Sequence, residues 1–152
     1  MHSKTKELTS REFHLARDVE WGDCDGAAII YYPTYVRWMD AATWALVREV
    51  GFDAERMRTE NRALPVVTTE CQFLIAARHG DRCVVRSHIE RIGWRSFVVA
   101  HDIVRSDGAL LAKGRETRVW ARYEDGPGTP LKGEPIAEPL KALLVAQNKS
   151  AA

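Results

Sequence analysis

A long amphipathic segment at residues 34–50 constrains the fold of this chain more than any other feature. Apolar residues recur along it at steps of three and four, which is the spacing of one face of an α-helix. Pro33 suits the first turn of that helix because the N–H that proline lacks would have no helical partner there, and Gly51 is a typical C-terminal stop. The apolar face is broad, so we predict a central helix that a larger element must wrap.

Five segments of the chain have the composition and alternation of β-strands. They are residues 13–21, before the helix, and residues 64–77, 83–92, 96–105 and 110–122, after it. Short turns separate the last four, and the Asp107-Gly108 pair is a strong hairpin signal. Because short turns join antiparallel neighbours, we predict an α+β domain in which a single antiparallel sheet of about five strands wraps one long helix.

The sequence divides into three parts. Residues 1–12 are polar and are expected to form a flexible leader. Residues 13–123 form one globular domain, and residues 124–152 form a linker rich in proline and glycine with a short C-terminal helix. The N-terminus has no apolar signal region, and no stretch approaches the ~18 apolar residues that span a bilayer. We therefore expect a soluble, cytoplasmic protein with no membrane partner.

Composition and residue spacing argue against several classes of function. The 22 lysines and arginines balance 21 aspartates and glutamates, so no basic surface for nucleic acid is expected. The three cysteines form no CxxC pair and are expected to be reduced thiols. The five histidines have neither HxxxH nor HExxH spacing, so we expect no metal site and no cofactor. Of the arginines of the strand half, most are expected on the solvated face of the sheet; the six are Arg91, Arg95, Arg105, Arg115, Arg118 and Arg122.

Two carboxylates lie in a turn just before the predicted helix. Asp23 and Asp25 stand between Gly22 and Gly26. The first N–H groups of a helix have no internal partner and carry partial positive charge, so they can receive an oxyanion beside a carboxylate. That is one half of an acyl-transfer site. From these residues alone, Asp25 is either a turn residue that hydrogen-bonds its own backbone or a reactive carboxylate, and Asp23 is a turn or capping residue.

The order of these motifs resembles a known family. A strand is followed by GDCD, an apolar run, YPTY and a helix containing RWMDA, and the strand meander farther along carries WRSF. This pattern is similar to the hot-dog fold and, within it, to the 4-hydroxybenzoyl-CoA thioesterase family of acyl-CoA hydrolases. The resemblance implies an acyl-CoA thioesterase, which cleaves its substrate to a free acid and CoA.

The resemblance assigns the reaction to the turn and the start of the helix. It implies that Asp25 is the catalytic carboxylate, acting as nucleophile or as general base, and that the backbone N–H of Tyr32 polarises the thioester carbonyl. It also implies a CoA site near the middle of the strand meander, where basic residues would bind the phosphates. Arg95 and Ser96 match the family's pattern there, and Arg91 is near. Trp94 stands where some members carry a further basic residue, and we expect it to contact the nucleotide or a subunit partner.

Two further positions match the acyl end of the family's pocket. Asp40 matches an acidic position on the central helix, and Leu64 matches a position that carries a hydroxyl side chain in the hydroxybenzoyl-specific form. An apolar Leu64 side chain cannot hydrogen-bond a phenol. We therefore expect a less polar aromatic acyl group or a short to medium aliphatic one.

Members of this fold hide the open edge of the sheet by pairing with a second copy. We expect a homodimer or homotetramer with the active site at the subunit interface. Two alternatives stay open for the function: a thioesterase that acts on acyl carrier protein, and a binding module that holds acyl-CoA without turnover. The hydratases of the fold resemble a different histidine and aspartate motif, which this sequence lacks.

Overall fold

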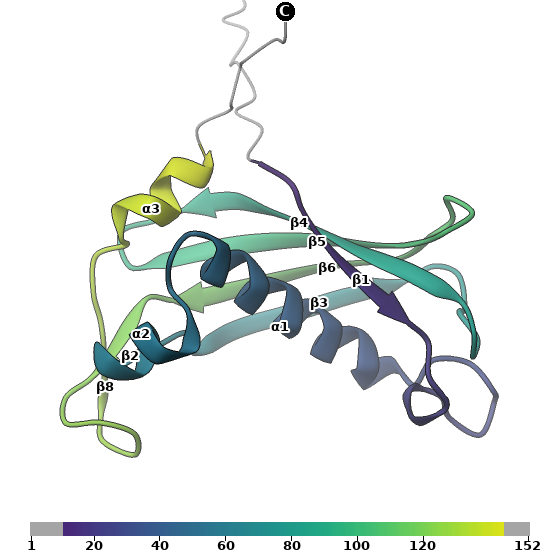
Figure 1. Ribbon diagram of the computed structural model, residues 1–152, viewed down its shortest axis with the longest axis horizontal. Helices are drawn as coiled ribbons and strands as arrows, with labels where there is room; N and C mark the ends of the chain where they lie inside the picture. Colours follow the sequence, from purple (N-terminus) through teal and green to yellow (C-terminus); the bar gives the residue numbers. More distant parts are fainter. Residues whose placement is uncertain (1–10, 145–152) are drawn as a thin grey trace, which may run out of the picture.

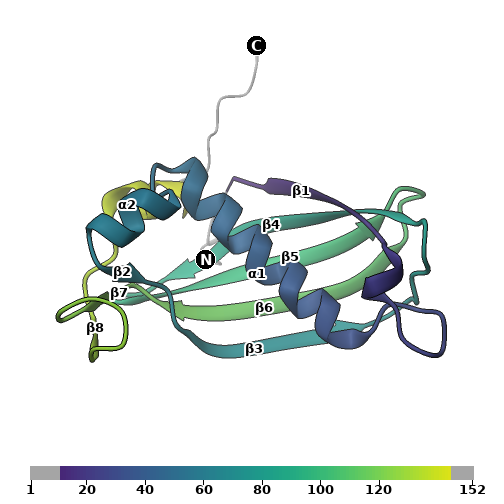
Figure 2. The same cartoon turned by 60° about the horizontal axis from the view of Figure 1, so that its bottom comes forward.

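A five-stranded antiparallel sheet wraps around one long helix in the computed structural model, which describes residues 11–144 (Figures 1 and 2). The strands, in their order across the sheet, are β1 (Phe13–Asp18), β4 (Arg82–Ile92), β5 (Ser96–Arg105), β6 (Leu110–Val119) and β3 (Val66–Phe73). All neighbours in this sheet are antiparallel. The structure confirms the predicted α+β class, with the sheet and central helix expected of the hot-dog fold.

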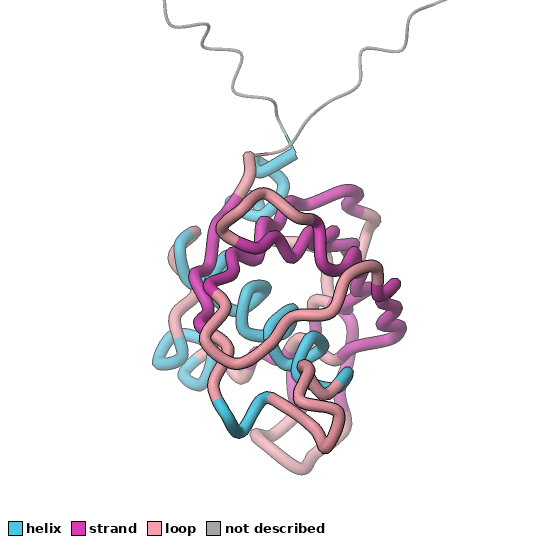
Figure 3. Tube along the Cα trace, turned by 90° about the vertical axis from the view of Figure 1, so that its right-hand side faces the viewer, coloured by secondary structure: helices cyan, strands magenta, loops and turns pink. Residues whose placement is uncertain are grey.

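The central helix is α1 (Tyr32–Glu49), which begins two residues before the predicted start. Tyr31 is its N-cap residue, and Pro33 lies in its first turn. The face that carries Met39 and Leu46 is fully buried against the concave side of the sheet. Figure 3 views the molecule from the end at which α1 begins and shows the strands curling around the helix.

The close approach of α1 to the sheet requires a residue without a side chain on β6. A Cβ placed on Gly114 would lie 1.9 Å from the Sδ atom of Met39. Met39 is itself fully buried, so a larger residue at this position would strain the packing. The core divides into two hydrophobic clusters, one around Trp38 and the other around Trp120.

Shorter elements lie at the two ends of the sheet. They are the 3-10 turn η1 (Trp21–Asp23), α2 (Ala54–Thr59), a second antiparallel sheet of β2 (Arg62–Ala63), β7 (Ala121–Tyr123) and β8 (Leu131–Gly133), then α3 (Glu138–Lys141) and the 3-10 turn η2 (Ala142–Leu144). The stretch predicted as a linker thus contains a strand, and Ile136 and Leu140 are buried in the second cluster. Residues 1–10 and 145–152 of the predicted leader and C-terminal part lie outside the described residues.

Strand β3 forms one edge of the sheet and exposes apolar side chains. Val67 is 62% exposed and Phe73 is 50% exposed, and Leu74 and Ile75, just after the strand, are nearly as open. An edge strand also presents unpaired N–H and C=O groups. A surface of this kind is typical of a site at which another molecule binds.

Candidate active site

The chain between β1 and α1 folds into a tight hydrogen-bonded turn. Cys24 and Ile30 form an isolated antiparallel bridge across its base, and within the turn the N–H of Asp25 donates to the carbonyl of Ile29 over 3.0 Å. Ala28 has a φ of 60°, in the left-handed region that residues with a side chain seldom adopt. The backbone position of Asp25 is therefore set by the hydrogen bonds of the turn.

Asp23 and Asp25 have different surroundings in this turn. Asp23 accepts a 2.9 Å hydrogen bond from the N–H of Glu20 and pairs with Arg37 at 3.4 Å, so it acts as a capping residue for η1. Asp25 is exposed, and its Oδ1 accepts a 2.8 Å hydrogen bond from the N–H of Ala27. Within the described part of the chain its Oδ2 has no hydrogen-bond partner, so that oxygen is available to a ligand.

The first amide of α1 lies beside the Asp25 turn. The N–H of Tyr32 has no acceptor among the described residues. Asp25 and Tyr32 line one depression of about 280 Å³, whose walls also include Tyr35 and Phe73. Burial is the main cause that raises the pKa of the Tyr35 phenol to about 12, so this phenol stays protonated at neutral pH. The structure brings together the carboxylate and the amide that the sequence indicated.

A second depression, of about 400 Å³, lies farther along α1. Its lining includes Val36 and Asp40 of α1, Val66 and Thr69 of β3, and Glu116 and Arg118 of β6. Both depressions therefore follow the line along which α1 meets the edge strand β3. We call this line, from the Asp25 turn to Asp40, the α1–β3 seam.

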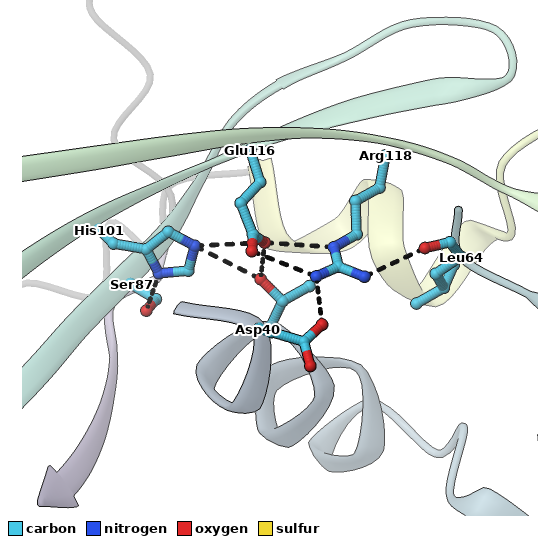
Figure 4. Close-up of polar contacts among 7 residues, drawn as sticks. Asp40, Leu64, Ser87, His101, Glu116 and Arg118 are labelled. Carbon is cyan, nitrogen blue, oxygen red and sulfur yellow. Dashed lines mark hydrogen bonds and ion pairs between the residues drawn. The ribbon is translucent and has the colours of Figure 1, made fainter. Parts of the chain in front are cut away.

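A layer of buried polar side chains lies beneath the seam, between α1 and the sheet (Figure 4). Its members are Thr43 of α1, Ser87 of β4, His101 of β5, and Glu116 and Arg118 of β6. The hydroxyl of Thr43 donates to Glu116 over 2.6 Å, and two nitrogens of Arg118 donate to the same carboxylate over 3.1 and 3.2 Å. The His101 ring lies 3.5 Å from Glu116 and 2.7 Å from the Ser87 hydroxyl.

This polar layer changes the acidity of Glu116. Burial by itself raises the pKa of the carboxyl, but hydrogen bonds from His101, Arg118 and Thr43 outweigh that effect and lower the pKa to about 2. Burial by itself lowers the pKa of Arg118, but the hydrogen bond and negative charge of Glu116, together with those of Asp40, outweigh that effect and raise it. Both groups therefore stay charged at neutral pH within the core.

Arg118 connects the polar layer to the seam. Its Nη2 donates to Oδ1 of Asp40 over 2.5 Å, and its Nη1 donates to the carbonyl of Leu64 over 3.0 Å. Arg118 is the exception to the expectation that most arginines of the strand half are solvated, because its side chain is 3% exposed, whereas Arg91, Arg95, Arg115 and Arg122 are exposed. One signal in the sequence points to this cluster: Glu116 and Arg118 are two residues apart on a strand and so share a face.

Leu64 does not line the seam with its side chain. That side chain is buried in the hydrophobic cluster around Trp120, and only its carbonyl reaches the polar layer, as an acceptor for Arg118. The Leu64 side chain therefore has no contact with the seam through which it could set the acyl specificity expected of it.

The residues predicted for CoA lie at the opposite end of the sheet from Asp25. Arg91, Trp94 and Arg95 are exposed around the turn between β4 and β5, and Ser96 begins β5. In Figure 1 this turn lies at the left, near α3, whereas the turn before α1 lies at the right. Within one chain, the structure does not bring these residues to Asp25, the carboxylate to which the resemblance assigns catalysis.

Other chemistry has few candidate groups in the described part of the chain. No three His, Cys, Asp or Glu side chains are grouped there so as to hold a metal ion, and no helix there is both long and apolar enough to cross a membrane. All three cysteines are free thiols. Burial raises the pKa of the Cys71 thiol and is the main cause that raises that of Cys83 to about 11, so these two are poor nucleophiles at neutral pH.

In sequence, the chain is similar to thioesterases. The sequence profile of the thioesterase-like superfamily matches residues 19–144. The 4-hydroxybenzoyl-CoA thioesterase of Pseudomonas sp. strain CBS-3 is 29% identical over 119 residues, which cover 74% of this chain and 84% of that protein. A putative acyl-CoA thioesterase of Bacillus subtilis strain 168 is 24% identical over 124 residues, which cover 82% of this chain and 83% of that protein.

Solved structures of thioesterases share the same fold. A gentisyl-coenzyme A thioesterase is 30% identical, with a TM-score of 0.73 over 86% of this chain and 99% of that chain. A variant of 4-hydroxybenzoyl-CoA thioesterase, complexed with 4-hydroxybenzoyl-CoA, is 26% identical, with a TM-score of 0.78 over 89% of this chain and 99% of that chain.

Proposed function

The chain belongs to the thioesterase-like superfamily and is a thioester hydrolase, and from this premise we propose how it cleaves an acyl-CoA and which acyl groups it accepts. The family confirms the resemblance predicted from the turn and helix motifs. Relatives named as 4-hydroxybenzoyl-CoA and gentisyl-coenzyme A thioesterases support an aromatic acyl group. A short to medium aliphatic group is equally compatible with the mainly apolar surface of the seam.

One observation supports the proposed chemistry above all others: Asp25 and Tyr32 line the same depression. Among the described residues, one oxygen of Asp25 has no hydrogen-bond donor and the amide of Tyr32 has no acceptor. A thioester carbonyl placed between them would meet a nucleophile or base on one side and a hydrogen-bond donor on the other. The dipole of α1 would strengthen that donor, because its positive end lies at the N-terminus.

In the proposed reaction, the Asp25 carboxylate either attacks the thioester carbon or takes a proton from the water that attacks it. Direct attack breaks the C–S bond, releases CoA as a thiolate and forms an anhydride, which water then hydrolyses to the acid. Attack by water forms the acid and breaks the C–S bond without a covalent intermediate, and the proton taken by Asp25 passes to the sulfur. In both routes negative charge develops on the carbonyl oxygen, where the Tyr32 amide would donate.

We propose that two copies pair through β3. The exposed apolar residues of this edge strand and its unpaired backbone groups favour such a contact. Antiparallel pairing of two identical edges around a two-fold axis sets opposite ends of the two chains side by side. The Arg91 to Ser96 turn of one copy would then lie at the same end as the Asp25 turn of the other, which would let both act on one acyl-CoA. A homotetramer would contain two such dimers.

A panel of thioesters tests the activity. Purified protein is incubated with aromatic and aliphatic acyl-CoAs and with acyl carrier protein thioesters, and free thiol is followed with a chromogenic reagent. We expect rapid release from acyl-CoAs and loss of this release in the Asp25→Asn variant. Faster release from the carrier protein would favour a carrier protein thioesterase. Equal, slow release by both proteins, with acyl-CoA still bound, would favour a binding module without turnover.

A further inference from the structure

The turn before α1 is a short hairpin whose base is closed at Asp23. The carbonyl of Asp23 accepts a 2.8 Å hydrogen bond from the N–H of Tyr31, the residue just before the first helical residue. The bridge between Cys24 and Ile30 and the hydrogen bond from the N–H of Asp25 lie farther along the same ladder. Asp25 and the start of α1 are therefore held on one hydrogen-bonded frame, which Asp23 closes.

Thr34 of α1 adds a second hydrogen bond to the base of this hairpin. Its hydroxyl donates to the same Asp23 carbonyl over 3.2 Å, and the residue is only 2% exposed. A threonine hydroxyl in a helix commonly bonds a carbonyl of the preceding helical turn, but this one bonds a residue eleven positions earlier, outside its own helix. Two donors from the start of α1, one from the backbone and one from a side chain, thus meet on one carbonyl.

The side chain of Asp23 holds that carbonyl in place from the other side. Its carboxylate accepts a 2.9 Å hydrogen bond from the N–H of Glu20 and lies 3.4 Å from the guanidinium of Arg37, farther along α1. It is largely buried, with 14% of the side chain exposed. Asp23 therefore joins η1, the hairpin and α1, whereas the Asp25 carboxylate is bonded only to the backbone of its own turn.

We propose that Thr34 and Asp23 position the Asp25 carboxylate relative to the Tyr32 amide and so set the rate of hydrolysis. This positioning role rests on the proposed parts of Asp25 and Tyr32 in the reaction. Neither Thr34 nor Asp23 lines the depression that those two residues share, so both act through other groups. If the base of the hairpin opened, the carboxylate would move relative to the amide, and a displacement of about 1 Å can cost ~100-fold in rate.

Removal of the Thr34 hydroxyl tests this role. Thr34→Val keeps a branched side chain of nearly the same shape but removes the donor, whereas Thr34→Ser keeps a hydroxyl. With the best substrate of the acyl-CoA panel, we expect Thr34→Val to lower kcat about tenfold and to leave KM within about twofold of the wild-type value. Thr34→Ser should keep kcat within about threefold of wild type, because its hydroxyl can still donate to Asp23.

Thr59→Val is the matched control. The Thr59 hydroxyl also donates to a backbone carbonyl, that of Glu55 over 2.9 Å, but it does so within its own helix and on the surface. In Figure 1 that helix, α2, lies at the left, far from the turn before α1. We expect Thr59→Val to keep the wild-type kcat. Urea unfolding checks that each variant is folded at the assay temperature.

Hydrogen exchange measures the positioning without turnover. The N–H groups of Asp25 and Tyr31 are bonded across the hairpin, so in Thr34→Val they should exchange about tenfold faster when followed by NMR. The amides of β5, in the centre of the sheet, should exchange less than about threefold faster. Equal acceleration in the hairpin and in β5 would show a general loss of stability and would overturn the positioning role.

The kinetic outcomes separate this role from the proposed function. An unchanged kcat in Thr34→Val, a rise in KM alone, or a loss of kcat that Thr34→Ser shares would each overturn the positioning role while hydrolysis stands. If the wild-type protein releases no thiol from any thioester of the panel, the proposed hydrolysis fails. The exchange rates alone then decide whether Thr34 holds the Asp25 turn against α1.

Discussion

Asp25 and Glu116 are both carboxylates close to the α1–β3 seam, yet the protein holds them in opposite ways. Asp25 is exposed and accepts one hydrogen bond, from the backbone of its own turn. Glu116 is 1% exposed and accepts hydrogen bonds from Thr43 and Arg118 on its two oxygens. A carboxylate whose acceptor sites are filled is a fixed structural charge, whereas one with a free oxygen can react. In the proposed mechanism, the same functional group would serve chemistry at Asp25, whereas at Glu116 it stabilises the fold.

The largest effect that we expect is on catalysis at Asp25. Asp25→Asn should lower kcat by about 1,000-fold, because the amide is neither a base nor a nucleophile. The free energy of unfolding should change little, since the amide oxygen can still accept the hydrogen bond from Ala27. Thiol-release kinetics and urea unfolding measure the two quantities. A fall in kcat smaller than about tenfold would show that Asp25 does not react.

The same change of carboxylate to amide at Glu116 should act on stability. Glu116→Gln should lower the free energy of unfolding by about 3 kcal/mol, because it leaves Arg118 buried with less compensation. Urea denaturation measures this loss of stability, and the slope of the free energy of unfolding against urea concentration should stay unchanged. Glu90→Gln is the matched control, since Glu90 pairs with Arg115 on the exposed face, and we expect it to lower stability by less than about 1 kcal/mol. If Glu116→Gln and Glu90→Gln lowered the free energy of unfolding equally, Glu116 would be no more important to the fold than an exposed carboxylate.

A third variant isolates the backbone amide of Tyr32, for which we propose a role in catalysis. Tyr32→Pro removes the N–H, and the first helical position tolerates proline. Tyr31, which would precede it, has φ −68° and ψ 125°, values that suit a residue before proline. We expect kcat about 100-fold below that of Tyr32→Ala, which loses the side chain and keeps the amide. Equal kcat values in the two variants would exclude the amide as the oxyanion donor.

The smallest effect expected is in acid. The folded pKa of Glu116 is about 2, against an ordinary value of 4.5. Because this pKa is lowered, the stabilisation from Glu116 is complete above about pH 5 and is lost as the pH falls toward 2. The Tm of the wild-type protein should therefore fall more steeply over this range than that of Glu116→Gln. If Tm fell equally with pH in the two proteins, the pKa of Glu116 would not be lowered in the folded state.

Local patterns in the sequence were sufficient for the framework of the fold, whereas the roles proposed for Asp25 and Tyr32 came from the resemblance to a family. The apolar period predicted α1, and alternation with short turns predicted the strands of the sheet. A glycine-bounded turn and a proline in the first helical turn are local signals, and they located the turn that carries Asp25 and the start of the helix at which Tyr32 lies. The segment with Ile136 and Leu140 was harder to predict, because these side chains are buried only by packing against the hydrophobic cluster around Trp120, which residues distant in the sequence form.

The sequence by itself determined which residues share a strand or helix face and where the chain turns, because these follow from the periods of 2 and 3.6 and from backbone chemistry. Only the tertiary structure decided which face of β6 is buried, and therefore that Arg118 joins the core. It also decided that Thr43, His101 and Glu116 meet. They come from three different elements, and only the pairing of distant strands around α1 sets them within hydrogen-bonding distance.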